Sequence, residues 1–205
     1  MTNVKTLDVS NLPPYTISNQ APLWWGQIMV AFIEGTMFFI LIGAYLYTRL
    51  RMDVWPPPGD QYPHLLLPSL ALIPLALSCL GSYWASEAAK KNSRSGMIGG
   101  MLVNLVLAGI FLAMRMVEWR SLNFNWKADI HGSYVWAFLG LHTFDCIGDL
   151  VFTAVLIVSV LINRYGPKQR IGVHVDSVVW YFLVGIWLPI YAVIYLGPYI
   201  LTTQQ

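Results

Sequence analysis

The sequence predicts an all-α integral membrane protein, a single bundle of five transmembrane helices. Hydrophobic residues make up 57% of its 205 residues and charged residues only 11%, less than half the charged share of an average soluble domain. Five apolar segments each have the roughly 20 residues needed to cross a hydrocarbon layer of about 30 Å. Most of the surface must therefore face lipid.

The expected spans cover residues 23–47, 64–88, 96–119, 133–162 and 177–200. Tryptophan and tyrosine lie near the ends of these segments, where amphipathic rings prefer the headgroup region. These aromatic residues are Trp24, Trp25, Tyr45, Tyr47, Tyr83, Trp84, Trp119, Trp136, Trp180 and Tyr199. They support the expected boundaries independently of hydropathy.

Polar connections separate the spans at residues 49–63, 89–95, 120–132 and 163–176. The first connection contains the triple proline Pro56–Pro58, which is typical of a turn or loop. No connection is long enough to hold a further domain, so we expect residues 23–205 to form one membrane domain. The polar segment 1–22 has no apolar stretch, so we expect no cleavable signal peptide.

Positive charges orient the bundle, because short loops rich in lysine and arginine stay on the cytoplasmic side. One side, formed by the N-terminal tail and the second and fourth connections, carries Lys5, Lys90, Lys91, Arg94, Arg164, Lys168 and Arg170. The other side carries Arg49, Arg51, Arg120 and Lys127. We therefore expect residues 1–22 to be a cytoplasmic tail and the C-terminus to lie outside.

Small residues recur at helical spacing in the second span and at the start of the third. They are Ser78, Ser82, Ala85, Ala89, Gly96 and Gly100. Such stripes allow two helices to approach closely, and we expect them to serve ordinary packing within the chain.

An acidic residue, Glu34, lies near the bilayer midplane in the first span. It is ten residues beyond Trp24, which is about 15 Å at the helical rise. A charged group at that depth costs several kcal/mol, so we expect the carboxyl group to be protonated or hydrogen bonded. Two interpretations stay open, a site coupled to proton movement and a buried hydrogen bond between helices.

A polar stripe is expected on the fourth span, where His142, Asp145 and Asp149 are spaced by three, four and seven residues and share one helical face. The depth of His142 matches that of Glu34, and we hypothesise a hydrogen bond between the two side chains. Asp149 is expected to reach water near the cytoplasmic interface.

Arg115, Glu118 and Trp119 lie at the end of the third span. The charged pair can extend toward the outer headgroups beside Trp119, and a local ion pair at spacing three is the simplest interpretation. Contact between Arg115 and a lipid phosphate is the alternative.

Several classes of protein are disfavoured by the composition. The net charge is only +2 and there is no basic run, so we expect no nucleic-acid partner. Cys79 and Cys146 are isolated in apolar segments, which disfavours a disulfide or a thiolate metal site. His142 is the one histidine inside a span, so we expect no self-contained haem or metal centre.

The motifs resemble those of subunit III of the haem–copper oxidases, which oxidise cytochrome c or quinol. The segment 34–39, Glu-Gly-Thr-Met-Phe-Phe, is similar to the family's glutamate-bearing helix, and Trp55–Pro58 is similar to its first loop. Further similar segments are Glu118–Trp119, His131–Ser133, the Gly140-Leu-His142 motif and the tryptophan frame of Trp180 and Trp187. The chain has the shape of the five-helix form of the family. It departs from the family pattern at Asp145, Tyr181 and Val184, which leaves the subfamily open.

This resemblance implies an accessory subunit with no catalytic centre of its own. Such subunits bind phospholipid, support proton uptake and stabilise the catalytic subunit. Haem and copper are expected in partner subunits I and II, within a larger respiratory supercomplex or a simpler oxidase. The expected location is the plasma (inner) membrane of a bacterium. Glu34 and His142 match the family's polar motif, and Arg115 and Glu118 are candidates for lipid or interhelical contacts.

Two other interpretations stay open. Glu34, Asp145 and Asp149 would serve as a proton relay in a small proton-coupled transporter, although the sequence shows no inverted halves. Alternatively, the chain is a membrane anchor that binds haem or quinone itself.

Overall fold

The computed structural model describes residues 22–59, 64–122, 124, 126–127, 129–162 and 166–197, without the side chains of residues 167–169. The expected cytoplasmic tail with Lys5, together with Arg164, the Lys168 side chain and Tyr199, lies outside the described residues. The part of the orientation argument that rests on these residues stays a prediction.

All regular structure in the described part of the chain is helical. The helices are α1 (Pro22–Arg51), α2 (Leu66–Lys90), α3 (Arg94–Ser121), α4 (Ile130–Leu161), α5 (Pro167–Tyr191) and the short π-helical segment η1 (Ala192–Leu196). Within the described residues, five helices, the last formed by α5 with η1, have the length and hydropathy needed to cross a membrane. The predicted all-α bundle of five membrane helices is confirmed.

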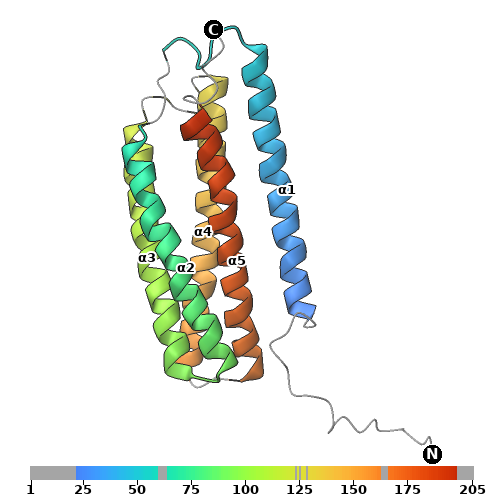
Figure 1. Ribbon diagram of the computed structural model, residues 1–205, viewed down its shortest axis with the longest axis vertical. Helices are drawn as coiled ribbons and strands as arrows, with labels where there is room; N and C mark the ends of the chain where they lie inside the picture. The colour runs from blue at the N-terminus through green and yellow to red at the C-terminus, as the bar shows by residue number, and fades with distance from the viewer. Residues whose placement is uncertain are drawn as a thin grey trace, which may run out of the picture.

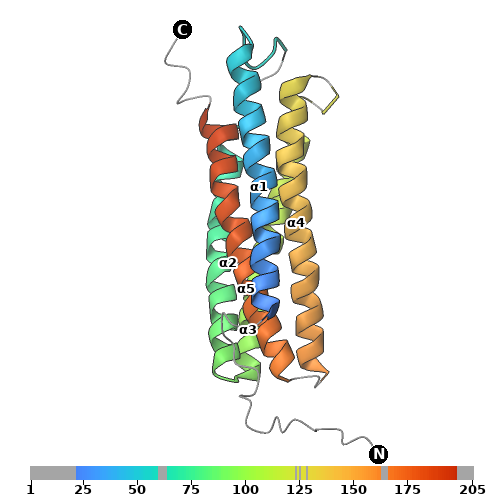
Figure 2. The same ribbon diagram turned by 90° about the vertical axis from the view of Figure 1, so that its right-hand side faces the viewer.

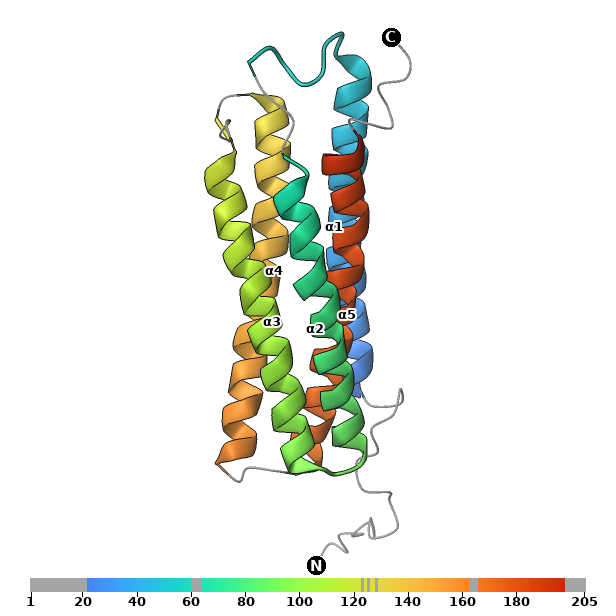
Figure 3. The ribbon, with the colours of Figure 1, turned by 60° about the vertical axis from the view of Figure 1, so that its left-hand side comes forward.

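Four of the helices form a closed ring. Each of α2, α3 and α4 packs against the next helix, and α5 packs back against α2; consecutive helices run in opposite directions (Figure 3). The first helix, α1, lies outside this ring against α5 and α4 (Figures 1 and 2). Both α4 and α5 have three neighbouring helices and are the two most buried of the five, whereas α1, with two neighbours, is the least buried.

Local sequence signals set several helix ends. Ser93 caps α3 by accepting a hydrogen bond from the Gly96 amide, and Asp129 caps α4 by accepting one from the Gly132 amide. Such short polar side chains satisfy amide groups that have no partner within the helix. The fifth helix begins at Pro167 rather than at the expected Ser177, because proline favours the first helical position and the helix extends beyond the apolar segment.

The stripe of small residues brings α2 and α3 into close contact. A methyl group added at Gly81 would lie 2.6 Å from the Asn104 amide nitrogen and 2.9 Å from the Gly100 carbonyl oxygen. The two backbones therefore touch at a point where only glycine fits. The expected packing within the chain is confirmed.

Hydrogen bonds also join α2 to α5. The Trp180 indole donates to Ser78 Oγ at 2.7 Å, Ser177 Oγ donates to the Ser82 carbonyl at 2.9 Å, and Ser86 Oγ lies 2.7 Å from His174 Nδ1. These polar side chains face each other inside the ring, where lipid offers no alternative partner.

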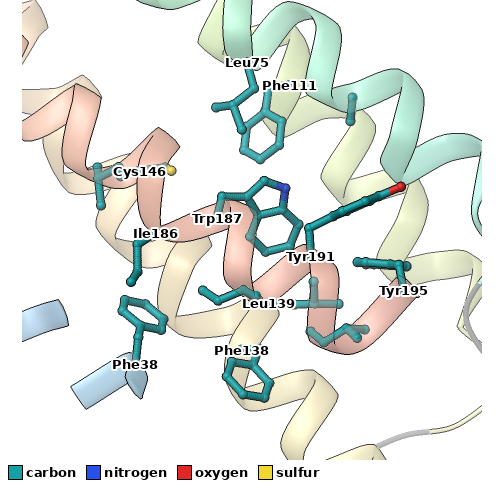
Figure 4. Packing of buried hydrophobic residues seen from close by; sticks show 14 of the residues in the cluster. Phe38, Leu75, Phe111, Phe138, Leu139, Cys146, Ile186, Trp187, Tyr191 and Tyr195 are labelled. Atoms are coloured by element: carbon teal, nitrogen blue, oxygen red, sulfur yellow. The ribbon is translucent and has the colours of Figure 1, made fainter. Parts of the chain in front are cut away.

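The core of the ring is rich in aromatic residues. Trp187 of α5 lies at its centre, among Phe111, Leu139, Tyr191 and Tyr195 (Figure 4). By contrast, large apolar side chains are exposed all around the outside of the bundle, a distribution expected where the solvent is lipid.

Candidate functional site

Three carboxyl side chains face one cavity of about 460 Å³ between α1, α4 and α5. Glu34 comes from α1, and Asp145 and Asp149 come from α4. The rest of the lining consists of Leu23, Gln27, Phe144, Gly148, Phe152, Val175, Val179 and Leu183. We call this cavity the acidic pocket. It brings together three of the four residues that the sequence singled out as polar groups within the membrane.

The carboxyl groups of the acidic pocket lie near the middle of the bundle, and the pocket extends along α1 to Leu23 in its first turn. Glu34 is within one turn of the midpoint of the 30-residue α1, Asp145 is at the midpoint of the 32-residue α4, and Asp149 is one turn further on. One turn is about 5.4 Å of helix, so all three carboxyl groups lie far from the ends of the helices. Asp149 is largely buried, with 8% of the residue exposed, and the expectation that it reaches water near the cytoplasmic interface stays a prediction.

The pocket carboxyl groups have unused hydrogen-bonding capacity. Among the described residues, neither Asp145 Oδ2 nor Asp149 Oδ2 has a hydrogen-bond partner. No lysine, arginine or histidine is among the described residues that line the pocket. A buried polar atom without a partner costs free energy, so these oxygens are suited to accept hydrogen bonds from a molecule inside the pocket.

A further carboxyl group, Asp176 of α5, lies deeper in the protein and was not predicted as a site residue. It is 3% exposed and accepts a hydrogen bond from Thr153 Oγ1, which lies 2.9 and 3.1 Å from its two oxygens. The expected fifth span begins at Ser177, so the sequence places Asp176 in a connection. The earlier start of α5 puts it inside the bundle.

His142 is not part of the acidic pocket. Its Nε2 lies 3.1 Å from the Leu183 carbonyl oxygen, and its ring centre lies 4.6 Å from that of Trp187. The hypothesised hydrogen bond between Glu34 and His142 is therefore wrong. At 3.6 residues per turn, positions 142 and 145 differ by about 60° around the helix. That rotation points His142 into the core and Asp145 toward α1.

A second polar group lies inside the ring, where Arg115 Nη1 is 3.1 Å from Glu118 Oε2. Both residues are buried, with 1% and 3% exposed. The Tyr195 hydroxyl donates to Glu118, and the Arg115 guanidinium lies 3.9 Å from the centre of the Trp187 ring. The predicted local ion pair is confirmed.

The location expected for this ion pair is wrong. Arg115 points into the core, where Trp187 and Phe111 cover it, so it neither extends to the outer headgroups nor meets a lipid phosphate. Trp119 points elsewhere and stacks on Trp136, with ring centres 5.7 Å apart. The three residues at the end of the third span thus divide between a buried charge pair and an aromatic stack.

Comparison with known proteins shows where this arrangement belongs. A family model described as "Cytochrome c oxidase subunit III" matches residues 10–199. The chain belongs to this family. The match covers nearly the whole sequence and includes every site described above.

Individual members of the cytochrome c oxidase subunit III family are distant relatives. The protein named cytochrome c oxidase subunit 3 from Synechocystis sp. is 27% identical over 173 residues, which is 84% of this chain and 74% of the relative. That from Thermostichus vulcanus is 26% identical, covering 83% of this chain and 85% of the relative. That from Podospora anserina is 25% identical, with 90% and 71% covered. The family and these names support an accessory, multi-pass membrane subunit of a haem–copper oxidase.

Two of the segments that resemble subunit III meet at one end of the bundle. Trp55, from the proline-rich connection, lies edge-on to His131 of α4, with ring centres 5.3 Å apart. The Trp55 indole also donates to the Tyr45 hydroxyl at 3.3 Å, and Phe124 packs against His131. These motifs therefore join α1 to α4 through aromatic packing.

The acidic pocket of this subunit III family member offers the acid–base chemistry of carboxyl groups. Within the described ranges, no group of three or more His, Cys, Asp or Glu side chains is placed to hold a metal ion. Cys146 packs against His142 at 3.8 Å, and Cys79 is half-buried. The side chains of the acidic pocket can accept hydrogen bonds and exchange protons.

Proposed function

We propose that this chain is the non-catalytic subunit III of a respiratory haem–copper terminal oxidase, bound to subunits I and II in the plasma membrane of a bacterium. The observation that carries the proposal is the family match over residues 10–199. The haems and copper belong to the partner subunits in this proposal. The oxidase functions alone or within a larger respiratory supercomplex.

Co-purification tests this assignment. An affinity-tagged copy expressed in its own host and extracted in mild detergent should retain a haem-containing partner. Native mass spectrometry would show the partner subunits, and a reduced-minus-oxidised visible spectrum would show the haem. Recovery of a colourless monomer under conditions that preserve other respiratory complexes would contradict the proposal. Proton transport by such a monomer in liposomes would favour the transporter instead.

A role in proton uptake is the second part of the proposal, and it is supported by the acidic pocket. Glu34, Asp145 and Asp149 lie around one cavity near the centre of the bundle. Carboxyl groups close together at membrane depth are the usual components of proton relays. We propose that these groups support proton delivery to the catalytic subunit, while His142, buried against Trp187, contributes to the packing that holds α4 and α5 together.

The Glu34→Gln variant tests the proton role. The amide keeps the size and hydrogen bonding of the side chain but does not exchange a proton. The oxidase should therefore assemble with a changed pH dependence or a changed turnover lifetime, measured as oxygen consumption over a pH series. Glu87→Gln is the matched control, since Glu87 pairs with Lys90 outside the pocket. Unchanged profiles with a lower melting temperature would identify Glu34 as a structural hydrogen-bonding group.

Phospholipid binding is the third part of the proposal. Because Arg115 is buried, we propose that the lipid binds away from this residue. Acyl chains would lie along the exposed apolar faces of α1 and α4, which carry Phe32, Ile33, Phe144 and Val151. Basic residues for lipid phosphates are available at the ends of the helices. Lipid bound in this way would be retained during gentle extraction and would appear as added mass in native spectra.

A further inference from the structure

The acidic pocket has the properties of a ligand site in addition to any role in proton transfer. Its volume of about 460 Å³ falls within the range of small-molecule sites in proteins, about 300–1,000 Å³. We propose that it binds the hydroquinone head of a membrane quinol, whose two hydroxyl groups donate hydrogen bonds to Asp145 and Asp149. This function is separate from the accessory role and does not depend on it.

Asp149 has a carboxyl oxygen that can accept a hydrogen bond and has no donor among the described residues. The residue is 8% exposed, its Oδ2 has no partner among the described residues, and it lines the pocket. The same holds for Oδ2 of the half-buried Asp145, one turn away. The two Oδ2 atoms do not bond to each other, because neither has a partner in the described part of the chain. A molecule that carries two hydroxyl donors satisfies both.

The depth of the three carboxyl groups favours a neutral head over a charged one. The three carboxyl groups lie within about one turn of the helix midpoints, whereas phospholipid headgroups lie about 15 Å from the midplane of a 30 Å hydrocarbon layer. An ammonium headgroup would have to cross that distance at a large desolvation cost. A hydroquinone is uncharged and dissolves within the hydrocarbon layer.

The residues that line the acidic pocket suit an aromatic ring that carries an apolar tail. Phe144 is 75% exposed and Phe152 is 45% exposed, so both aromatic rings face the membrane at the rim. Val175, Val179 and Leu183 form the apolar wall on α5. A hydroquinone ring would lie between this wall and the carboxyl groups, with its tail leaving past the rim into lipid.

Direct binding tests the proposal without substitutions. The purified full chain, without partner subunits, is placed in phosphatidylcholine nanodiscs, and binding of radiolabelled decylubiquinol is measured under anaerobic conditions. Saturable binding near one molecule per chain is expected. The dimethyl ether of the same quinol has the same ring but no donors. It should bind at least about tenfold more weakly, because two hydrogen bonds to carboxyl groups are lost.

A pair of glycine substitutions locates the site. A methyl group added at Gly148 meets no atom within 4 Å, and the residue lines the pocket, so Gly148→Leu should fill the cavity without displacing the backbone. Gly43→Leu is the matched control, since Gly43 is also open and lies outside the pocket. Quinol binding should be lost in the first variant and kept in the second, with equal melting temperatures for both.

Three results would overturn the proposal. Equal affinity for the quinol and its dimethyl ether would show that no donor is recognised. Unchanged binding in Gly148→Leu would place the quinol elsewhere. Displacement of the quinol by phosphatidylethanolamine, with no displacement by phosphatidylglycerol, would identify the pocket as an ammonium site.

Discussion

At the scale of single residues, the buried Arg115 shows how a positive charge is tolerated inside the bundle. Glu118 neutralises it at 3.1 Å, the Trp187 ring covers its guanidinium, and the Tyr195 hydroxyl donates to the other carboxylate oxygen. A buried ion pair is weak evidence of net stability, but breaking one leaves an uncompensated charge. The stability of the core should therefore depend on keeping both partners or neither.

This dependence predicts the effects of substitutions in the ion pair. Arg115→Met should lower the free energy of unfolding by about 3–5 kcal/mol, because Glu118 keeps its buried charge without a counter-charge. The double variant Arg115→Met, Glu118→Gln should lose less than the single one. Denaturant titration in micelles measures both. The exposed Arg120 supplies the control, since Arg120→Met should change stability by no more than about 0.5 kcal/mol. A single variant as stable as the wild type would show that the pair contributes nothing.

At the scale of secondary-structure elements, α5 holds the molecule together. It contacts α1, α2 and α4, and hydrogen bonds from Trp180 and Ser177 fix its position on α2. Its end widens into the π-helical segment η1 shortly after Pro189, a residue that donates no backbone hydrogen bond. Tyr195 lies in that segment, so the π-helical turn carries the hydroxyl that reaches Glu118 on α3.

The close contact between α2 and α3 predicts that a single added methyl group lowers the stability of the protein. Gly81→Ala places a methyl group 2.6 Å from the Asn104 amide nitrogen, so the helices must separate. We expect a loss of about 1–3 kcal/mol from overpacking, seen as a lower melting temperature in detergent. Gly109→Ala, an open position on α3, should be neutral or stabilising by up to about 1 kcal/mol. Equal melting temperatures for both variants would contradict the close contact.

At the scale of the whole molecule, the position of α1 outside the ring creates the acidic pocket. Glu34 would face lipid on an isolated helix, but packing of α1 against α4 and α5 brings it to Asp145 and Asp149. The pocket therefore depends on how α1 docks, which makes α1 the element most directly linked to the proposed proton and quinol chemistry.

The orientation of the whole bundle in the membrane is a further prediction. Lys91 lies in the exposed turn between α2 and α3, and Lys127 is exposed at the opposite end. In intact cells, a membrane-impermeant maleimide should label Lys127→Cys and leave Lys91→Cys unlabelled, because the positively charged turn stays inside. Both should be labelled after permeabilisation. The parent chain, with Cys79 and Cys146 only, measures the background. The reverse labelling pattern would invert the topology.

The sequence by itself determined the five helices, the central depth of Glu34 and the pairing of Arg115 with Glu118, because hydropathy and helical spacing are properties of short segments. The family resemblance was likewise carried by local motifs. Tertiary structure decided which of these polar groups meet. On α4, His142 points into the core and Asp145 lines the pocket. The early start of α5 buries Asp176, and Arg115 packs inside the bundle against the rings of Trp187 and Phe111. Each outcome depends on the angle at which one helix packs on another, and that angle is set by contacts between residues far apart in the chain.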